Sequence, residues 1–410
     1  MRTLLSFLWI VLTAAAASLS AADWPQFLGP SRNGIAAVDE PALPEVLPTD
    51  LKPLWEKAAG SGFAGPVVSA GKVILFHREG GDMTTEALDA ATGRVLWRST
   101  YVTDYVDSFG FDNGPRAVPT VAEGRVFTLG PEGRVTALDL ASGRELWSYD
   151  TASALTSPQG FFGRAPSPLV LGGHVIIAAG GSQNGKAAGL VALEASTGQV
   201  AWMAVDDEAG YASPVAVGQA QILAWMRNQL WLVNAADGSI AANTRLRSSM
   251  DASVNAATPI ACGQDRWLVS AGYGVGAHVF TRKPTALEES WSRDRVLDCH
   301  YATPVFLAGH VFGFHGRQET GMNLRCISAE GDLAWESPER LPGGTLLAVG
   351  NKLLMLTEDG ELRVLRADAS RYDQLASWQI LRAGHRSHAA FADGVFFARD
   401  SERLVACRLR

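Results

Sequence analysis

The sequence contains little cysteine, and its four cysteines follow no spacing that is typical of a zinc or haem site. It also contains no Ser/His/Asp arrangement of a hydrolase and no cluster of side chains at metal-ligand spacing. The glycines of residues 272–276 belong to a strand turn with no helix after it, so they do not predict a phosphate-binding loop. The sequence therefore carries no motif that names a substrate or a reaction.

An excess of basic residues is absent as well. The chain of 410 residues has 35 Lys and Arg against 42 Asp and Glu, which gives a net charge of −7 at pH 7. Because binding to nucleic acid requires a basic surface, this balance argues against a nucleic-acid partner.

Long apolar runs are absent beyond the first 22 residues. This segment combines a positive charge at Arg2, an apolar stretch over 4–17 and small residues up to Ala22, a pattern typical of a cleaved signal peptide. The apolar stretch is short for a membrane span, so an uncleaved anchor is the alternative. No cysteine stands near the expected cleavage point, which argues against a lipid anchor. We expect cleavage before Asp23 and export to the periplasm or the extracellular space, with no membrane span in the mature chain.

Export would permit disulfide bonds. Cys262 and Cys299 flank one repeat of the chain, while Cys326 and Cys407 stand farther on. The sequence leaves the pairing of these four residues open, and the alternative is four buried thiols in strands.

One short pattern recurs along the chain: a turn-forming polar residue, a glycine, and a tryptophan four residues later. It is clearest where Asp139 sets the turn, Gly143 supplies a positive φ and Trp147 lies on the next strand. The tryptophan or its equivalent stands at positions 55, 97, 147, 202, 242 (an alanine), 291, 335 and 378. The mean spacing of about 46 residues is typical of a four-stranded propeller blade. We expect each indole to pack between neighbouring blades.

A second pattern marks where each blade begins. A proline, preceded in most cases by a small residue and followed by further strand residues, opens six inner strands, in residues 65–68, 118–121, 167–170, 213–216, 257–260 and 302–305. The last two blades begin at 345–347 and 389–391 without the proline. The final blade ends before its outermost strand, and a strand without a blade, residues 54–57, stands at the front.

Joining these two pieces closes a ring. The sequence therefore predicts an all-β fold over residues 51–410: an eight-bladed β-propeller of four-stranded antiparallel blades, closed by an N-terminal outer strand. Residues 23–50 are expected to form an arm and a proline-rich linker, with Trp24 and Phe27 docked on the body because they are large and apolar.

The repeat resembles that of the pyrroloquinoline-quinone (PQQ)-like β-propeller family, in which Asp-x-x-Thr-Gly-x-x-x-Trp follows Ala-Leu. The resemblance covers residues 51–410, and residues 24–30 are similar to the start of exported members. One branch, the quinone-dependent alcohol dehydrogenases, implies adjacent cysteines over the quinone and a calcium held by carboxylate and amide groups; no two cysteines are adjacent here. The other branch, the propeller subunit of the outer-membrane protein assembly machinery, is usually lipidated. The resemblance implies the fold, and we expect no cofactor, with PQQ as the alternative.

The segments just before the inner strands converge on the propeller axis, where loops on a rigid scaffold often carry function. The candidate ligand-binding residues in these segments are Arg116, Arg164, Tyr211, Asn255, His300 and Arg386. Their cationic members predict a positive mouth for a carboxylate or an acidic peptide, with Asp112 and Asp298 as the nearby acids. The alternative is that these side chains bond carbonyl groups of adjacent blades and plug the channel.

Two functions follow as hypotheses. The first is an exported, non-catalytic and monomeric scaffold that binds a protein, a peptide or a small anionic ligand. The second is a quinone-dependent oxidoreductase. No metal site is expected.

Overall fold

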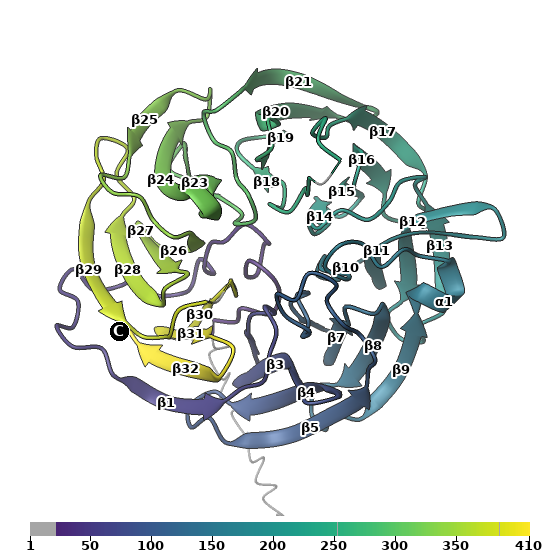
Figure 1. The fold of residues 1–410 in the computed structure, drawn as a ribbon, viewed down its shortest axis with the longest axis horizontal. Coiled ribbons are helices and arrows are strands. Elements are labelled where there is room, and N and C mark those ends of the chain that lie inside the picture. Colours follow the sequence, from purple (N-terminus) through teal and green to yellow (C-terminus); the bar gives the residue numbers. More distant parts are fainter. Residues whose placement is uncertain (1–21, 252, 385) are drawn as a thin grey trace, which may run out of the picture.

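The structure, a computed structural model, describes residues 22–251, 253–384 and 386–410. The expected signal peptide, residues 1–22, lies outside the described residues except for Ala22. The described chain folds into eight four-stranded antiparallel sheets arranged around one axis, so the predicted eight-bladed propeller is confirmed (Figure 1). Among these residues no helix has the length and apolar character needed to cross a membrane.

The first four blades each take their strands in sequence order from the axis to the rim (Figure 1). The first contains β2 (Val67–Ser69), β3 (Lys72–Glu79), β4 (Asp82–Asp89) and β5 (Val95–Val102). The second contains β6 (Thr120–Ala122), β7 (Arg125–Leu129), β8 (Arg134–Asp139) and β9 (Glu145–Asp150), followed by a short helix, α1 (Thr151–Leu155). The third contains β10 (Leu169–Leu171), β11 (His174–Gln183), β12 (Lys186–Glu194) and β13 (Val200–Ala204). The fourth contains β14 (Val215–Val217), β15 (Gln221–Trp225), β16 (Gln229–Asn234) and β17 (Ile240–Arg245).

The next three blades repeat this order. The fifth contains β18 (Ile260–Ala261), β19 (Arg266–Ala271), β20 (Gly276–Lys283) and β21 (Ala286–Arg293). The sixth contains β22 (Val305–Leu307), β23 (His310–Arg317), the 3-10 turn Gln318–Thr320, β24 (Gly321–Ser328) and β25 (Leu333–Glu336). The seventh contains β26 (Gly344–Val349), β27 (Lys352–Thr357), β28 (Glu361–Arg366) and β29 (Gln374–Gln379).

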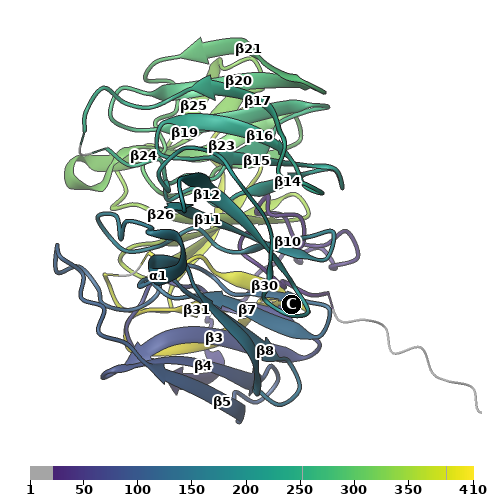
Figure 2. The same cartoon turned by 90° about the vertical axis from the view of Figure 1, so that its right-hand side faces the viewer.

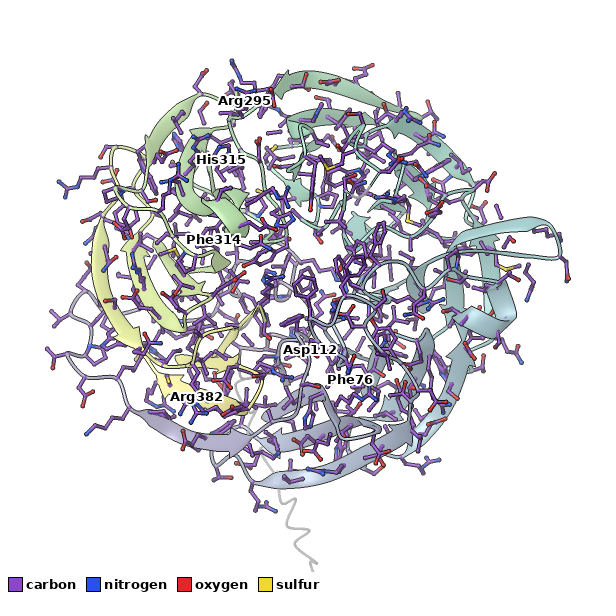
Figure 3. All side chains as sticks on the ribbon, in the orientation of Figure 1. Phe76, Asp112, Arg295, Phe314, His315 and Arg382 are labelled. Carbon is purple, nitrogen blue, oxygen red and sulfur yellow. The ribbon has the colours of Figure 1, made fainter. Side chains whose placement is uncertain are left out.

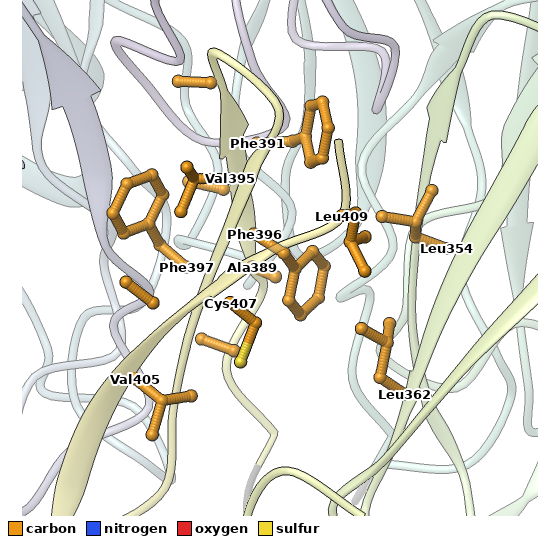
Figure 4. Close-up of a cluster of buried hydrophobic side chains, with 14 of the residues drawn as sticks. Leu354, Leu362, Ala389, Phe391, Val395, Phe396, Phe397, Val405, Cys407 and Leu409 are labelled. Carbon is orange, nitrogen blue, oxygen red and sulfur yellow. The ribbon is translucent and has the colours of Figure 1, made fainter. Parts of the chain in front are cut away.

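The eighth blade joins the two ends of the chain. Its strands β30 (Ala390–Ala392), β31 (Val395–Arg399) and β32 (Arg403–Arg408) come from the C-terminus, and β1 (Pro53–Ala58) adds the outermost strand antiparallel to β32. Figure 4 shows the apolar core of this blade, where Phe396 and Cys407 face Leu354 and Leu362 of the seventh blade. The predicted closure of the ring by the strand that contains Trp55 is therefore confirmed.

The turn glycine and the tryptophan of the repeat interlock neighbouring blades. The indole Nε1–H of Trp97 donates to the carbonyl of Leu140 in the next blade, at 3.0 Å. A Cβ atom at Gly143 would lie 2.4 Å from the Trp97 ring, so this glycine is required by the close approach as well as by its φ of 71°. Six such indole-to-carbonyl bonds join successive blades, from Trp55, Trp97, Trp147, Trp202, Trp291 and Trp335.

Hydroxyl groups join the inner strands in the same way. The residue before four of the six blade-opening prolines donates its backbone N–H to the side chain of the equivalent residue one blade further on. The four bonds run from Val118 to Ser167, from Ser167 to Ser213, from Ser213 to Thr258 and from Thr258 to Thr303, at 2.8 to 3.0 Å. Because these N–H groups are buried, the hydroxyl groups satisfy donors that would otherwise lack partners.

The N-terminal arm crosses the middle of the ring (purple in Figure 1). Trp24 exchanges two backbone hydrogen bonds with Val68 of the first blade. Ala36 donates its backbone N–H to Ala348 of the seventh blade, while Gly34 accepts the N–H of Ala348. Between these points the chain lies on the channel, so the arm closes one end of it; Figure 2 shows the wheel from the side.

All four cysteines are buried and free. Burial raises the pKa of Cys299 and of Cys326 to about 12, and that of Cys262 and of Cys407 to about 11. The pairing of the four cysteines, which the sequence left open, is therefore resolved: none forms a disulfide bond, and all four are thiols packed in the blades.

Candidate functional site

A cavity of about 240 Å³ lies on the propeller axis, between the arm and the loops that precede the inner strands. Seven of its lining residues are Phe or Tyr: Phe27, Phe63, Phe111, Phe162, Tyr211, Tyr273 and Tyr301. Polar lining comes from Arg116, Arg386, His300, His388, Gln318 and Glu319. Figure 3 shows how densely side chains fill the blades around it; Asp112 lies toward the middle of the ring and Arg295 at its edge.

Four of the six candidate residues from the sequence line this cavity, namely Arg116, Tyr211, His300 and Arg386. Arg164 and Asn255 do not. The Arg164 guanidinium donates to the carbonyl groups of Glu132 and Ser157. The Asn255 amide donates to the carbonyl of Met226 at 2.8 Å. These two side chains thus bond carbonyl groups of loops and blades, as the alternative expectation has it.

Arg116 is held by a buried carboxylate. Its Nη2 donates to Asp107 Oδ2 at 3.0 Å. The same carboxylate accepts backbone N–H groups of Phe109, Phe111 and Asp112. Burial alone would raise the pKa of Asp107, but these hydrogen bonds and the Arg116 charge together lower it. Asp107 therefore shapes the loop and neutralises Arg116 at once.

Arg386 has a similar partner. Its Nε donates to Glu358 Oε1 at 3.1 Å, and the Tyr301 hydroxyl donates to the same oxygen at 2.5 Å. Burial and the Glu358 carboxylate raise the pKa of Tyr301 well above its ordinary value, so its hydroxyl stays protonated. The guanidinium also lies 5.8 Å from the centre of the Phe111 ring and 5.6 Å from that of Tyr301.

His300 is not a cation in this site. Burial lowers its pKa, so the ring is neutral at pH 7. Its Nε2 lies 2.8 Å from the Tyr273 hydroxyl, and its Nδ1 bonds the Gln318 side chain. The carbonyl oxygen of Gln318 can only accept, which assigns the donated proton to Nδ1 and leaves Nε2 to accept from Tyr273.

The expected positive mouth is thereby corrected. Arg116 and Arg386 are paired with carboxylates, Arg164 lies outside the cavity and His300 is neutral. The two acids expected beside the arginines are not the ones that pair with them. Asp112 offers Arg116 only its backbone carbonyl, at 3.3 Å, and among the described residues Asp298 forms no ion pair with an arginine side chain. Asp107 and Glu358, which the sequence reasoning missed, take those places; no repeat position marks either of them.

Four phenylalanines from two loops form a cluster at one edge of the cavity, and two of them, Phe111 and Phe162, line it. Phe109 and Phe111 are 56% and 58% exposed. The centre of the Phe162 ring lies 5.1 Å from that of Phe109 and 5.8 Å from that of Phe111. The Tyr211 hydroxyl accepts the backbone N–H groups of Phe161 and Phe162 and so fixes the second rim loop. We call Phe109, Phe111, Phe161 and Phe162 the aromatic rim.

The arm supplies the opposite wall. Phe27 meets the His388 ring edge-on at 4.8 Å. Burial lowers the pKa of His388 to about 4, so this imidazole is also neutral. Arg32 is 3% exposed and donates to the Pro168 and Pro214 carbonyl oxygens of two inner strands, and burial lowers its pKa to about 9. Among the described residues no carboxylate bonds Arg32, so it places a charge behind the cavity.

The cavity does not fit a calcium-bound quinone. None of the four cysteines lines it, so no disulfide covers it. Its side-chain carboxylate and amide oxygens come from Glu319 and Gln318, and Gln318 is already bonded by His300. Within the described residues no three His, Cys, Asp or Glu side chains are grouped to hold a metal ion.

Comparison of the sequence with those of known proteins identifies the family of the chain. The family model described as "Outer membrane protein assembly factor BamB" matches residues 81–296, just over half of the chain. The chain is 27% identical over 279 residues to an outer membrane protein assembly factor BamB of Moranella endobia, covering 66% of this chain and 68% of that protein.

More distant relatives include the quinohemoprotein alcohol dehydrogenase ADH-IIG of Pseudomonas putida, 32% identical over 118 residues. That match covers 28% of this chain and 16% of the dehydrogenase. Among solved structures, BamB from Moraxella catarrhalis superposes with a TM-score of 0.66 at 14% identity, covering 88% of this chain and 98% of that one, which shows a shared fold. The chain belongs to the PQQ-like β-propeller family whose matching model is described as outer membrane protein assembly factor BamB.

Proposed function

We propose that this protein is an exported, non-catalytic propeller that binds a segment of a partner protein at the axial cavity and the aromatic rim. The observation that carries this proposal is the exposure of Phe109 and Phe111 at the edge of a cavity with aromatic walls. Exposed apolar groups gathered at one place on a soluble surface typically mark a binding site.

The construction of the rim supports binding rather than catalysis. Asp107 and Tyr211 hold the two rim loops through backbone hydrogen bonds, so the phenylalanines are presented on a fixed support. The cavity residues include no serine or cysteine bonded to a base, and Arg116 and Arg386 are each paired with a carboxylate. The name of the BamB relatives, outer membrane protein assembly factors, agrees with a partner in the cell envelope. In this proposal the protein itself is a monomeric scaffold in the periplasm.

The test is cross-linking in the native envelope with a rim variant. Phe109→Ser with Phe111→Ser should lose the cross-linked partner while the melting temperature stays unchanged, because both side chains are exposed. Ile240→Ser with Leu333→Ser is the matched control, since these side chains are 51% and 50% exposed on outer strands. Equal partner capture by the two variants would contradict the proposal.

The second candidate function, a quinone-dependent oxidoreductase, rests on the partial identity to the alcohol dehydrogenases. It is tested by incubating the mature protein with PQQ and calcium. A bound chromophore with dye-linked alcohol oxidation would overturn the scaffold proposal, whereas no chromophore retained after gel filtration excludes the oxidoreductase.

A further inference from the structure

We propose that the axial cavity binds an aromatic ring that carries a carboxylate, with the ring between the aromatic walls and the carboxylate on Arg386. This inference rests on the proposed function and names the chemistry that the cavity recognises in a partner.

The size of the cavity sets the first limit. Pockets for drug-sized ligands have volumes of about 300–1,000 Å³, and this cavity has about 240 Å³. It therefore holds one ring with a short polar group rather than a folded peptide. Phe27 closes it on the side of the arm, so the ligand enters past the rim at Phe111 and Phe162.

Aromatic walls can bind either a ring or a cation. Here the protein's own arginine side chains already lie over four of these aromatic rings, which are therefore already occupied by a cation. The Arg116 guanidinium lies 5.5 Å from the centre of the Phe63 ring and 5.7 Å from that of Phe162. The Arg386 guanidinium lies over Phe111 and Tyr301. The guanidinium of Arg32 behind the wall, which no carboxylate among the described residues bonds, also repels an incoming ammonium. A neutral ring can still pack against the ring edges at the separations that aromatic pairs prefer.

Arg386 offers the place for the negative end. Its Nε bonds Glu358, while among the described residues neither Nη1 nor Nη2 has a hydrogen-bond acceptor. Its side chain is 30% exposed, so a ligand can reach these donors. Arg116 is different, because both of its Nη atoms are occupied by Asp107 and the Asp112 carbonyl.

The charges around the cavity leave room for one anion. Arg116 is paired with Asp107, Arg386 with Glu358, and Arg317 with Glu319 at 3.1 Å. The imidazoles of His300 and His388 are neutral. Arg32, behind the wall at Ser167, adds a positive charge that no carboxylate among the described residues bonds. A bound carboxylate would balance it in a site of low dielectric constant.

The experiment compares N-acetyl-L-phenylalanine with its amide, N-acetyl-L-phenylalaninamide, by titration calorimetry on the mature protein. The acid should bind about tenfold more tightly at low salt, and the difference should shrink as salt screens the charge. Phenethylamine should not bind. An equal affinity for acid and amide, or no binding of either, would overturn the inference.

Paired variants locate the recognition. Arg386→Gln with Glu358→Gln neutralises both partners and keeps an acceptor for Tyr301, so the preference for the acid should disappear while the amide binds as before. Arg382→Gln with Glu402→Gln removes an exposed ion pair outside the cavity and should leave the preference intact. A preference that survives in the first variant would also overturn the inference.

Two further ligands distinguish the source of this chemistry. N-acetyl-Gly-Gly-Phe with a free C-terminus represents the end of a partner chain, and phenylacetate represents a free aromatic acid. Tighter binding of the peptide would show that the natural ligand is the C-terminus of a partner chain, whereas equal binding of the two would show that it is a free aromatic acid. Both outcomes support recognition of an aromatic ring that carries a carboxylate. If the rim variant loses its partner but acid and amide bind equally, the scaffold proposal stands and only this inference fails.

Discussion

Asp298 is half-buried, and its carboxyl Oδ1 is buried without a hydrogen-bond partner among the described residues. Burial, with repulsion from Asp294 as a further cause, raises its pKa from 3.8 to about 6. The backbone N–H of Asp298 donates to His315 Nδ1, and burial lowers the pKa of that histidine to about 4. At pH 7 the ionised Asp298 carboxylate therefore destabilises the folded state.

We predict that Asp298→Asn stabilises the protein at pH 8. The folded state binds the proton of this carboxyl more tightly than the unfolded state, so its contribution favours folding at low pH and declines as the pH rises from about 4 through about 6. The variant should melt a few degrees higher than the wild type at pH 8 and at the same temperature at pH 4. Melting curves from pH 4 to 8 check this; an unchanged difference at all pH values would contradict it.

At the scale of elements, the blades are joined by contacts that recur with the repeat. We predict that Gly143→Ala destabilises the protein more than Gly124→Ala. Both glycines have a φ near 70°, so both variants carry the strain of a left-handed alanine, about 1–3 kcal/mol. A Cβ at Gly143 meets Trp97 at 2.4 Å, whereas one at Gly124 meets nothing within 4 Å. The clash should add about 1–3 kcal/mol, seen in the denaturant midpoint.

Equal midpoints for these two variants would show that the interlock contributes nothing beyond the turn geometry. Gly71→Ala is a second control, because Gly71 has a φ of 70° and open space around its Cα.

The hydroxyl bonds between inner strands give a second prediction at this scale. Thr258→Val removes the acceptor for the buried backbone N–H of Ser213 at nearly constant volume, and should cost about 1–3 kcal/mol. Thr128→Val is the matched control: Thr128 is 1% exposed, against 2% for Thr258, and its hydroxyl has no partner among the described residues. The control should be neutral or stabilising in the same unfolding assay. Loss of stability in both variants alike would contradict the role of the bond.

For the whole molecule, the periodic parts were predictable from sequence and the aperiodic parts were not. The repeat marked by Trp97 and Trp147 predicted the number of blades, and the lone strand at Trp55 predicted the closure. Cavity positions such as Arg116 followed from their distance to a blade-opening proline. The route of Phe27 and Arg32 through the channel could not be predicted, because the arm has no repeat and its hydrogen bonds reach six different blades.

The partners of the arginines were missed for a related physical reason. Asp107 lies nine residues before Arg116 in a loop of irregular backbone, and Glu358 lies 28 residues before Arg386 in another hairpin. Pairing at such positions depends on loop conformation, which hydrophobic periodicity does not encode. The chemistry of the cavity, neutral aromatic walls with compensated cations, therefore required the structure.

Closure of the ring allows a prediction for the whole molecule. A chain that starts at Leu51 loses the arm but keeps β1, and a chain that starts at Gly60 loses both. Only the second exposes the edge of β32 beside Phe397, removes the Trp55 indole from the Ala90 carbonyl and breaks the 2.5 Å ion pair between Lys57 and Glu86. Because an unpaired edge invites association, the second chain should melt at least several degrees lower than the first and form oligomers in gel filtration.

Adding a synthetic peptide of residues 51–59 should restore the monomer by supplying the missing strand. If the two chains melt together, or if the peptide has no effect on the shorter one, β1 is an appendage and the wheel is held shut by the remaining contacts between its first and last blades.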